Sequence, residues 1–232
     1  MFINIKDARK HYGEGETLVN ALDGVSLSLN EGRIYVILGP SGSGKSTLLN
    51  MIGGLDSLDS GEITIADRNI SGSDKKKLID YRREDVGFVF QFYNLIPDLT
   101  VQENIEVVSD ISKNPLDIEE VMTALDIEKY RNRFPKELSG GQQQRAAIAR
   151  ALIKNPKILL CDELTGALDS KSSRGVLKFI EKINEQFKTT IIIITHNEAI
   201  ADMADSVIRI KDGRIADYTE NSHKLSAEEL AL

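Results

Sequence analysis

Hydrophobic and polar residues follow two different patterns along the chain. Residues 2–5 and 25–29 alternate between the two kinds, as strands with one solvent-exposed face do. Three other runs are apolar throughout, which is typical of strands buried on both faces: residues 34–38, 158–161 and 191–194. Each run precedes a segment of helical periodicity, and these segments cover residues 46–52, 171–184 and 198–203. This order predicts an α/β fold with a parallel sheet covered by helices on both faces.

The middle of the chain has a different pattern. Residues 101–111 and 118–125 show helical periodicity, and no buried strand is evident around them. A further helical segment follows at residues 143–153. These segments predict a helical insertion at about residues 95–155, within a single domain of residues 1–232.

Two short elements are predicted near the C-terminus. Residues 207–210 and 214–218 read as a β-hairpin, because the Asp-Gly pair between them favours a tight turn. Residues 226–232 predict a short helix capped by Ser226, with Glu229 three residues further on.

Composition and charge exclude several classes of protein. The chain has 232 residues, 41% hydrophobic and 28% charged, which is ordinary for a globular domain. Its 29 Lys and Arg against 36 Asp and Glu give a net charge of −7, the opposite of the balance in proteins that neutralise nucleic-acid phosphates. The only cysteine, Cys161, cannot form an internal disulfide, and no apolar run approaches the roughly 20 residues of a membrane span. The first ten residues are too charged for a signal peptide, so we expect a chain that works inside the cell.

A phosphate-binding motif follows the apolar run of residues 34–38. The next residues read GPSGSGKS and fit the pattern G-x-x-x-x-G-K-[ST] between a buried strand and a helix. Backbone N–H groups of such a loop point at phosphate oxygens, and the positive end of the helix faces the same anion. Lys45 is predicted to reach the β and γ phosphates of ATP, and Ser46 to bind Mg²⁺. The predicted loop consists of Gly39, Pro40, Ser41, Gly42, Ser43, Gly44, Lys45, Ser46 and Thr47.

Two acidic residues follow the apolar run of residues 158–161. Ligands of open α/β sheets collect at the carboxyl ends of the strands, so Asp162 and Glu163 should face the phosphate loop. We predict that Asp162 belongs to the Mg²⁺ shell and that Glu163 is the base that orients the attacking water. A structural ion pair at a strand end is the alternative reading of these two residues.

Two further polar side chains follow apolar runs. His196 comes after residues 191–194 and could hydrogen-bond both a γ-phosphate oxygen and Glu163. Gln91 follows the strand predicted at residues 86–90, and its amide could contact Mg²⁺ and the attacking water. We therefore predict that both belong to the catalytic site, although a lone histidine is more often structural.

A second segment suited to an anion precedes the helix of residues 143–153. It comprises Ser139, Gly140, Gly141 and Gln142, again a small-residue turn at a helix N-terminus. Two copies of the chain, arranged head to tail, could each complete the phosphate site of the other.

Together these motifs resemble the nucleotide-binding subunits of ABC transporters over essentially the whole length of the chain. Residues 138–142, LSGGQ, look like the signature of that family. The resemblance implies the P-loop NTPase fold: a RecA-like parallel sheet core, an N-terminal antiparallel β subdomain and an inserted helical subdomain. It also implies these roles: Gln91 in the Q-loop, Asp162 as the Walker B aspartate, Glu163 as the catalytic glutamate, Asp169 in the D-loop, His196 as the switch histidine and Tyr12 stacked on adenine.

Within the family, residues 87–97 and 165–170 look most like the branch that serves macrolide export, lipoprotein release and antimicrobial-peptide resistance. The resemblance implies an ATPase bound peripherally to separate integral membrane permease subunits at the cytoplasmic face of the membrane. It also implies an ATP-dependent head-to-tail homodimer, with a lipoprotein, an antimicrobial peptide or a drug as cargo and with no nucleic-acid partner. A cell-division type ATPase that drives a membrane partner without transport, and an ATP-sensing scaffold with little hydrolysis, are the alternatives.

Two features depart from the family pattern. The family usually has proline after the catalytic glutamate, and this chain has Leu164 there. Leucine restores a backbone N–H and frees φ, so the path from Glu163 to Asp169 is expected to be less rigid. The helical insertion also looks short for the branch, which bears on the surface that contacts the partner.

Overall fold

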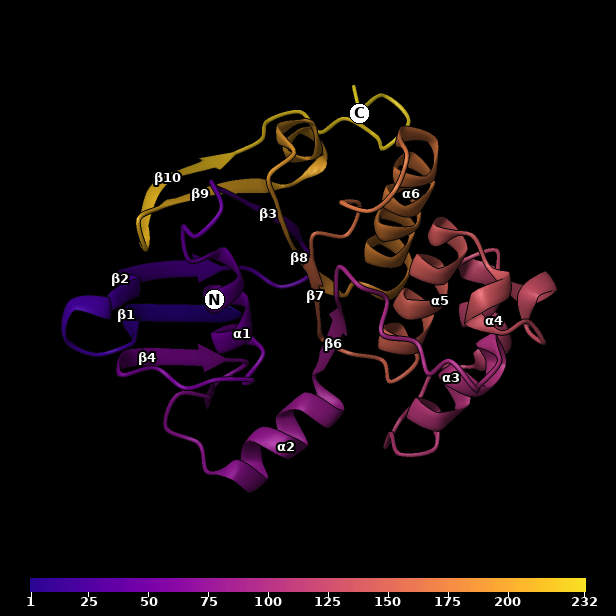
Figure 1. Ribbon diagram of the computed structural model, residues 1–232, viewed down its shortest axis with the longest axis horizontal. Helices are drawn as coiled ribbons and strands as arrows, with labels where there is room; N and C mark the ends of the chain where they lie inside the picture. Colours follow the sequence, from indigo (N-terminus) through magenta and orange to yellow (C-terminus); the bar gives the residue numbers. More distant parts are fainter.

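The strands form two sheets of different kinds. The computed structural model describes the backbone of residues 1–232 and the side chains of all these residues except residue 16. The larger sheet has the strand order β10-β9-β3-β8-β7-β6, and every neighbouring pair from β9 to β6 is parallel (Figure 1). The smaller sheet is antiparallel, in the order β2-β1-β4-β5. These two sheets confirm the predicted combination of a parallel core and an N-terminal antiparallel part.

The elements have the following bounds. The strands are β1 (Ile3–Tyr12), β2 (Val19–Leu29), β3 (Ile34–Leu38), β4 (Ser60–Ile65), β5 (Arg68–Asn69), β6 (Val86–Val89), β7 (Ile158–Asp162), β8 (Thr190–Thr195), β9 (Ser206–Lys211) and β10 (Arg214–Glu220). The α-helices are α1 (Lys45–Ile52), α2 (Lys75–Glu84), α3 (Val101–Ser109), α4 (Ile118–Ala124), α5 (Gly140–Leu152) and α6 (Ser170–Phe187). Short 3₁₀ turns are η1 (Gly15–Thr17), η2 (Glu128–Tyr130), η3 (Pro135–Glu137) and η4 (Glu198–Met203).

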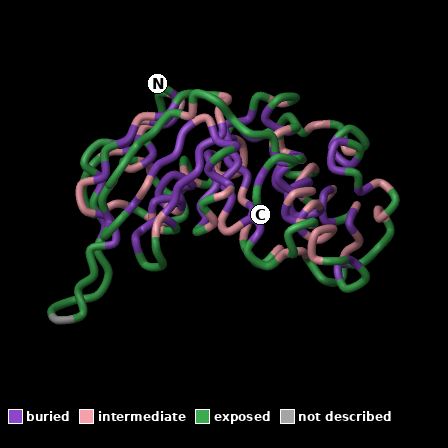
Figure 2. The backbone as a smooth tube through the Cα atoms, turned by 90° about the horizontal axis from the view of Figure 1, so that it is seen from above, coloured by how far each residue is buried: buried purple, intermediate pink, exposed green. Residues whose placement is uncertain are grey.

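The large sheet separates two apolar cores. Along the fully buried β3, Val36 and Leu38 pack into the core that contains α5 and α6. Tyr35 and Ile37 point to the other face and pack with α1 and the small sheet. Figure 2 shows the buried segments filling the interior from one end of the molecule to the other. Because both faces of β3, β7 and β8 are covered, their sequences are apolar throughout, as predicted.

A helical segment connects β6 to β7. The described chain between these two strands contains α3, α4 and α5 with short turns, and no strand. Helix α5 packs against both α3 and α6, so it joins this segment to the large sheet. The boundaries of the insertion at about residues 95–155 stay a prediction.

One predicted element is wrong. Residues 226–232 form a single turn instead of a helix, although the Ser226 hydroxyl does donate to Glu229 Oε2 at 2.7 Å. Seven residues nucleate a helix poorly, and bonds to α6 compete: Ala227 N–H donates to Glu181 Oε1, and Arg174 donates to the Leu230 carbonyl. The buried side chains of Ala227 and Leu230 therefore hold this tail against α6 in an irregular path.

The hydrophobic and polar pattern also missed some elements and predicted one helix of the wrong type. Strands β4 and β5 and helix α2 were not predicted, and residues 198–203 form a 3₁₀ turn where an α-helix was expected. None of the helices in the described part of the chain is both long enough and apolar enough to cross a lipid bilayer.

Candidate active site

The loop between β3 and α1 surrounds a cavity of about 470 Å³ at the carboxyl ends of the parallel strands. Helix α1 begins after Gly44, whose φ of +103° lies in the left-handed region, and a Cβ there would approach the Ala21 carbonyl oxygen to 2.3 Å. Only glycine allows this path of the loop. The cavity is lined by Ala21, Ser41, Gly42, Ser43, Gly44, Lys45, Ser46, Thr47, Gln91, Glu163 and His196.

Lys45 is almost completely buried at the base of this loop. Its ammonium group donates to the Gly39 carbonyl at 2.7 Å and to the Pro40 carbonyl at 2.8 Å. The Ser43 hydroxyl is also buried and has no hydrogen-bond partner among the described residues. No side chain caps the first turn of α1 either. The loop thus presents a cation, a free hydroxyl and uncapped N–H groups, which is the donor set that phosphate oxygens require.

Glu163 and Asp162 lie at the end of β7, as predicted. Glu163 has a φ of +48°, and its N–H donates to the Ile194 carbonyl at 3.0 Å, which fixes this left-handed turn at the sheet edge. Burial, and next the negative charge of Glu163, raise the pKa of Asp162, while the positive charge of Lys45 opposes that rise. Asp162 therefore lies within electrostatic reach of the phosphate loop, where a bound cation would relieve the cost of its charge.

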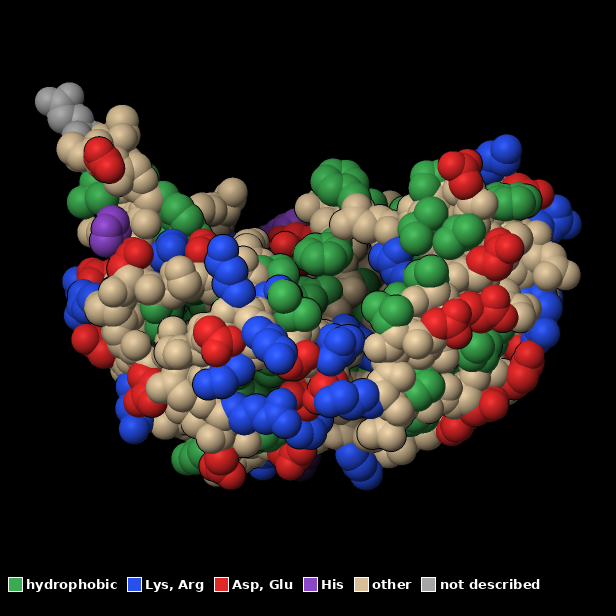
Figure 3. All heavy atoms as spheres, turned by 90° about the horizontal axis from the view of Figure 1, so that it is seen from below, with side chains coloured by type: hydrophobic (Ala, Val, Ile, Leu, Met, Phe, Trp, Pro, Cys, Tyr) green, Lys and Arg blue, Asp and Glu red, His purple; other side chains and the backbone are tan. Residues whose placement is uncertain are grey.

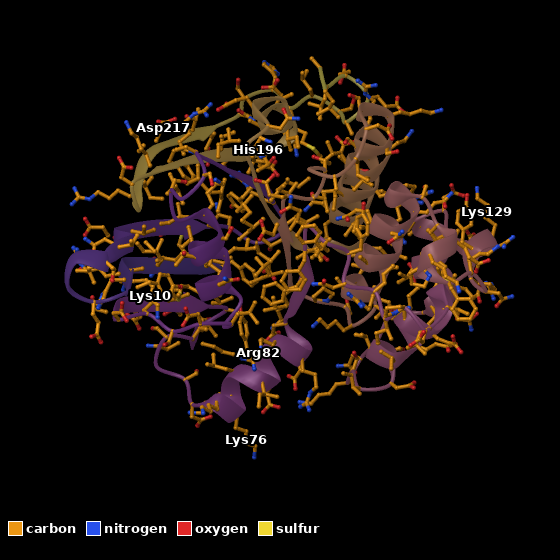
Figure 4. The ribbon with its side chains drawn as sticks, in the orientation of Figure 1. Lys10, Lys76, Arg82, Lys129, His196 and Asp217 are labelled. Carbon is orange, nitrogen blue, oxygen red and sulfur yellow. The ribbon has the colours of Figure 1, made fainter. Side chains whose placement is uncertain are left out.

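His196 and Gln91 reach the same cavity from the ends of β8 and β6 (Figure 4 labels His196). Nδ1 of His196 hydrogen-bonds Oε1 of Glu163 at 3.1 Å. The same nitrogen lies 3.0 Å from Oε2, but Oε2 is buried and has no hydrogen-bond partner of its own in the described residues. Nδ1 of His196 thus lies within reach of both carboxylate oxygens of Glu163, which holds the carboxylate in place at the end of β7.

A magnesium ion would fit this group of side chains. Ser46, Gln91 and Asp162 supply a hydroxyl, an amide oxygen and a carboxylate, which are the oxygen ligands that Mg²⁺ takes. Among the described residues no group of three or more His, Cys, Asp or Glu could hold a metal. Mg²⁺ usually binds through one or two carboxylates together with phosphates and waters, so such a group is not required.

Tyr12 lies outside the lining of the cavity, at the end of β1. Its side chain is half exposed, and its hydroxyl donates to Asp56 Oδ2 at 2.8 Å. Lys10 donates to Asp56 Oδ1 at 3.2 Å, and its ammonium lies 5.2 Å from the centre of the Tyr12 ring. Burial and the bond to Asp56 raise the pKa of the Tyr12 hydroxyl, which keeps it protonated as the donor.

The segment of Ser139–Gln142 is not part of the cavity. Ser139 caps α5: its Oγ accepts from the Gln142 N–H at 3.4 Å, and Gln142 Oε1 accepts from the Ser139 N–H at 2.8 Å. A Cβ on Gly140 would lie 2.8 Å from the Tyr93 hydroxyl, so a larger residue here would have to displace the Tyr93 side chain. A single chain therefore keeps its two anion-binding segments apart.

Asp169 joins the second segment instead of the phosphate loop. It caps α6 by accepting from Ser172 N–H and Oγ, both at 2.9 Å, and these bonds lower the pKa of its carboxyl. Ser172 in turn lies against Gly141. Asp169 and the segment of Ser139–Gln142 thus form one surface.

The sequence patterns missed Ala21, Lys10 and Asp56. Ala21 lies within a strand that the pattern predicted only in part, and its carbonyl contacts the phosphate loop. Lys10 and Asp56 are 46 residues apart in the sequence. They are in contact because the end of β1 lies next to the segment that follows α1. No local signal in the sequence could have indicated that contact.

Comparison with known proteins places these features in a family. A family model described as "ABC transporter" matches residues 22–166. The putative ABC transporter ATP-binding protein MG467 homolog of Mycoplasma pneumoniae is 44% identical over 93% of this chain and 65% of its own length. The macrolide export ATP-binding/permease protein MacB of Pasteurella multocida is 42% identical over 98% of this chain and 36% of its own.

Solved structures agree with these sequence matches. The ATP-binding cassette MJ0796, in a dimeric post-hydrolysis state bound to ADP and Pi, superimposes with a TM-score of 0.84. It is 39% identical, and the match covers 94% of this chain and 98% of that one. The chain spans 65% and 50% of the first two curated relatives that it matches, so those relatives contain substantial further sequence.

Proposed function

The chain belongs to the ABC transporter family of ATPases, and from this premise we propose that two copies bind ATP between them and power a separate membrane permease. The observation that carries the proposal is the separation of the two anion-binding segments within one chain. The cavity of Lys45 holds the phosphate loop, Glu163 and His196, whereas the capped turn of Ser139–Gln142 lies outside it. A second copy, turned head to tail, can bring its own turn to the γ-phosphate.

In this proposal the phosphate loop binds and orients ATP. Lys45 exchanges its two carbonyl contacts for β- and γ-phosphate oxygens, and the free N–H groups of α1 receive the remaining phosphate charge. Ser46, Gln91 and Asp162 would hold Mg²⁺, which neutralises charge on the phosphates when bound. Tyr12, held by Asp56, would stack on the adenine.

Hydrolysis then depends on Glu163. Its carboxylate would accept a hydrogen bond from the attacking water, while the bond from His196 holds that carboxylate at the cavity. Ser139, Gly140, Gly141 and Gln142 of the second copy would donate to the same phosphate, and Asp169 would lie across the interface. Positioning and electrostatics therefore supply most of the catalysis.

A surface beside Gln91 is suited to the permease. Phe92 is 75% exposed and Ile96 is 40% exposed, so the loop after β6 presents apolar side chains next to a cavity residue. Figure 3 shows apolar side chains gathered in the middle of a hollowed face. A permease segment that packs there would contact the loop of Gln91, which links the nucleotide to the membrane partner.

The finer assignment follows from the relatives. Homologues named as macrolide export proteins favour export or extraction of a drug, a lipoprotein or an antimicrobial peptide, with this chain bound peripherally at the cytoplasmic face of the membrane. One observation favours the scaffold alternative. Leu164 stands where the family usually has proline, and its buried side chain packs in the core behind Glu163.

The test compares the wild-type chain with Glu163→Gln in a phosphate-release assay and measures size in solution with and without Mg-ATP. Removing a positioned base should lower kcat by about 10²–10⁴-fold and leave nucleotide affinity unchanged. The variant should be a monomer alone and a dimer with ATP. Glu198→Gln, which alters a carboxylate paired with Arg209 outside the cavity, is the matched control and should hydrolyse normally. Wild-type activity no greater than that of Glu163→Gln would favour the scaffold, and dimers that ignore ATP would contradict the shared site.

A further inference from the structure

Helix α2 carries a charge that is opposite to that of the chain. Its ten residues, KKKLIDYRRE, contain five basic and two acidic side chains, whereas the whole chain has a net charge of −7. Lys75, Lys76 and Lys77 fill the first turn, and no acidic residue accompanies them there. The positive end of the helix dipole disfavours cations at this position, so helix stability does not account for these three lysines.

The two halves of α2 are held differently. In the second half, Arg82 donates to the Gly54 carbonyl at 2.6 Å, and Arg83 donates to Asp80 at 2.7 Å. In the first half, all three lysines are exposed, and in the described part of the chain the only ion pair is Lys77 with Asp74 at 4.0 Å. The first turn is therefore free to bind something outside the chain, while the second anchors the helix to the body.

The surroundings of this turn are basic and partly apolar. Ile79 is 51% exposed and lies one helical turn after Lys75 and Lys76. Lys77 also lines a cavity of about 610 Å³ with Arg68 and Lys113, which are paired with Asp85 and Glu84, so the three lysines of α2 carry most of the unbalanced positive charge here. In Figure 3, blue side chains gather on the face seen from below, where Figure 1 has α2, and in Figure 4 Lys76 lies at the outer tip of the helix.

The second half of α2 and the apolar loop after β6 both contact the end of α5. Beyond the end of α5, Lys154 donates to the Arg82 carbonyl at 2.7 Å. One turn earlier, Arg150 donates to the carbonyls of Asn94 at 2.6 Å and Tyr93 at 3.2 Å. The end of α5 thus connects α2 to the loop that contains Phe92 and Ile96. A permease bound at that loop would bring the bilayer surface close to α2.

We propose that Lys75, Lys76 and Lys77, with the exposed Ile79 beside them, lie against the anionic lipid headgroups of the membrane. The orientation of the chain relative to the membrane rests on the proposed function. The argument from the charge of α2 does not depend on it. Three consecutive helical residues radiate over about 200° of the helix, whereas a specific ion-pairing stripe uses positions three or four apart. Such a broad array of cations next to an exposed isoleucine fits a diffuse layer of headgroups better than one acidic peptide.

The acidic remainder of the chain does not cancel this attraction. At physiological ionic strength, charges more than about 8 Å from the headgroups are largely screened. A lysine near an anionic surface strengthens binding about fivefold, so three of them give about 100-fold.

The test is flotation of the whole chain, without nucleotide, with vesicles of phosphatidylcholine alone or with about 30% phosphatidylglycerol. Wild type should bind only the anionic vesicles and should lose this binding in high salt. The triple variant Lys75→Gln, Lys76→Gln, Lys77→Gln should bind about 100-fold more weakly. Lysine and glutamine have similar helix propensities, so the helix should persist.

A control variant removes the same number of charges elsewhere: Lys129→Gln, Lys178→Gln and Lys211→Gln, which are exposed lysines outside α2. It should float like wild type. The proposal is overturned if wild type shows no preference for anionic vesicles, if the α2 variant floats like wild type, or if both variants lose binding equally. Phosphate release by all three proteins, measured in parallel, reports on the proposed function independently of flotation.

Discussion

Helix α1 begins after a glycine-rich loop and helix α5 begins with two glycines, yet their N-terminal ends differ in how an anion could bind there. The first turn of α1 has no side-chain cap, and buried Lys45 and the unpartnered Ser43 hydroxyl stand beside it. The first turn of α5 is closed by its own side chains, because Ser139 and Gln142 hydrogen-bond each other's backbone. One end needs an external anion to satisfy it, and the other is satisfied alone.

The two helix starts also differ in charge, and this difference again indicates that only α1 attracts an anion by itself. The α1 loop includes a lysine, whereas residues 138–142 at the start of α5 contain no basic residue. A helix N-terminus without a cation attracts phosphate weakly, so α5 can be expected to bind a γ-phosphate only when another chain presents it. If the active site is divided in this way, as proposed, we expect it to be inactive until two chains meet.

The strongest test of this comparison is Lys45→Ala. The Lys45 ammonium donates to two loop carbonyls and, in the proposed function, also binds the phosphates. Without it, kcat should fall by about 10³-fold or more and nucleotide affinity should fall as well. Phosphate release and nucleotide titration measure the two effects. Lys211→Ala, an exposed lysine outside the cavity, is the control. If Lys45→Ala hydrolysed ATP normally, the α1 loop would not be the phosphate site.

Ser139→Ala tests the neutral half. We expect hydrolysis to fall about 10²-fold and ATP-dependent dimers to weaken, while a single chain binds ATP as before. The variant also loses a helix cap, which costs about 1 kcal/mol of folding stability. Asp117→Ala removes a comparable cap from α4, where Asp117 Oδ1 accepts from the Glu120 N–H at 2.9 Å. Equal loss of activity in the two variants would mean that Ser139 acts through stability alone.

The sequence predicts the phosphate loop and the strand ends beside it more completely than the elements around them. The apolar runs of β3, β7 and β8 could be predicted because burial on both faces leaves no polar position in them. The positions of Gln91, Glu163 and His196 followed because the carboxyl ends of parallel strands share one edge. Their catalytic roles stay predictions.

Features that depend on contacts outside the element itself could not be predicted. Strand β5 has two exposed polar residues and exists only through its pairing with β4. The contact between Tyr12 and Asp56 depends on how the small sheet meets the end of α1. The C-terminal turn has a capping signal at Ser226 that tertiary bonds override. For Tyr12 and for the C-terminal turn the deciding interaction joins segments far apart in sequence, whereas for β5 it is the pairing with the neighbouring β4, which the two polar residues of β5 do not indicate.

A smaller effect is expected at the adenine end of the charged half. Asp56→Ala and Tyr12→Phe each remove the bond that orients the Tyr12 ring, so KM for ATP should rise by about 2–10-fold with kcat unchanged. The double variant should be no worse than either single variant, because both remove one interaction. Steady-state kinetics of the three proteins measure this. Additive effects, or a change confined to kcat, would show that Asp56 does not act through Tyr12.

The smallest effect concerns the far ends of the same two helices, which meet at Arg82. Beyond α1, the Gly54 carbonyl accepts a hydrogen bond from the Arg82 guanidinium, which keeps its charge at any pH used here. Beyond α5, the Lys154 ammonium donates to the Arg82 carbonyl. Burial lowers the pKa of this ammonium to about 8. The unfolded chain keeps the Lys154 proton up to a pKa of 10.5, so between about pH 8 and 10.5 it holds more protons than the folded chain. Stability from this group therefore rises with pH in that window, and the penalty of the buried charge is fully present below it. The Tm of Lys154→Met minus that of wild type should fall by about 3–6 °C between roughly pH 7 and pH 10, as followed by thermal unfolding, with Lys211→Met as the parallel control. If the Tm difference between the variant and wild type did not change with pH, the Lys154 ammonium would be fully solvated. The contact at the end of α5 would then be as independent of pH as the Arg82 contact at the end of α1.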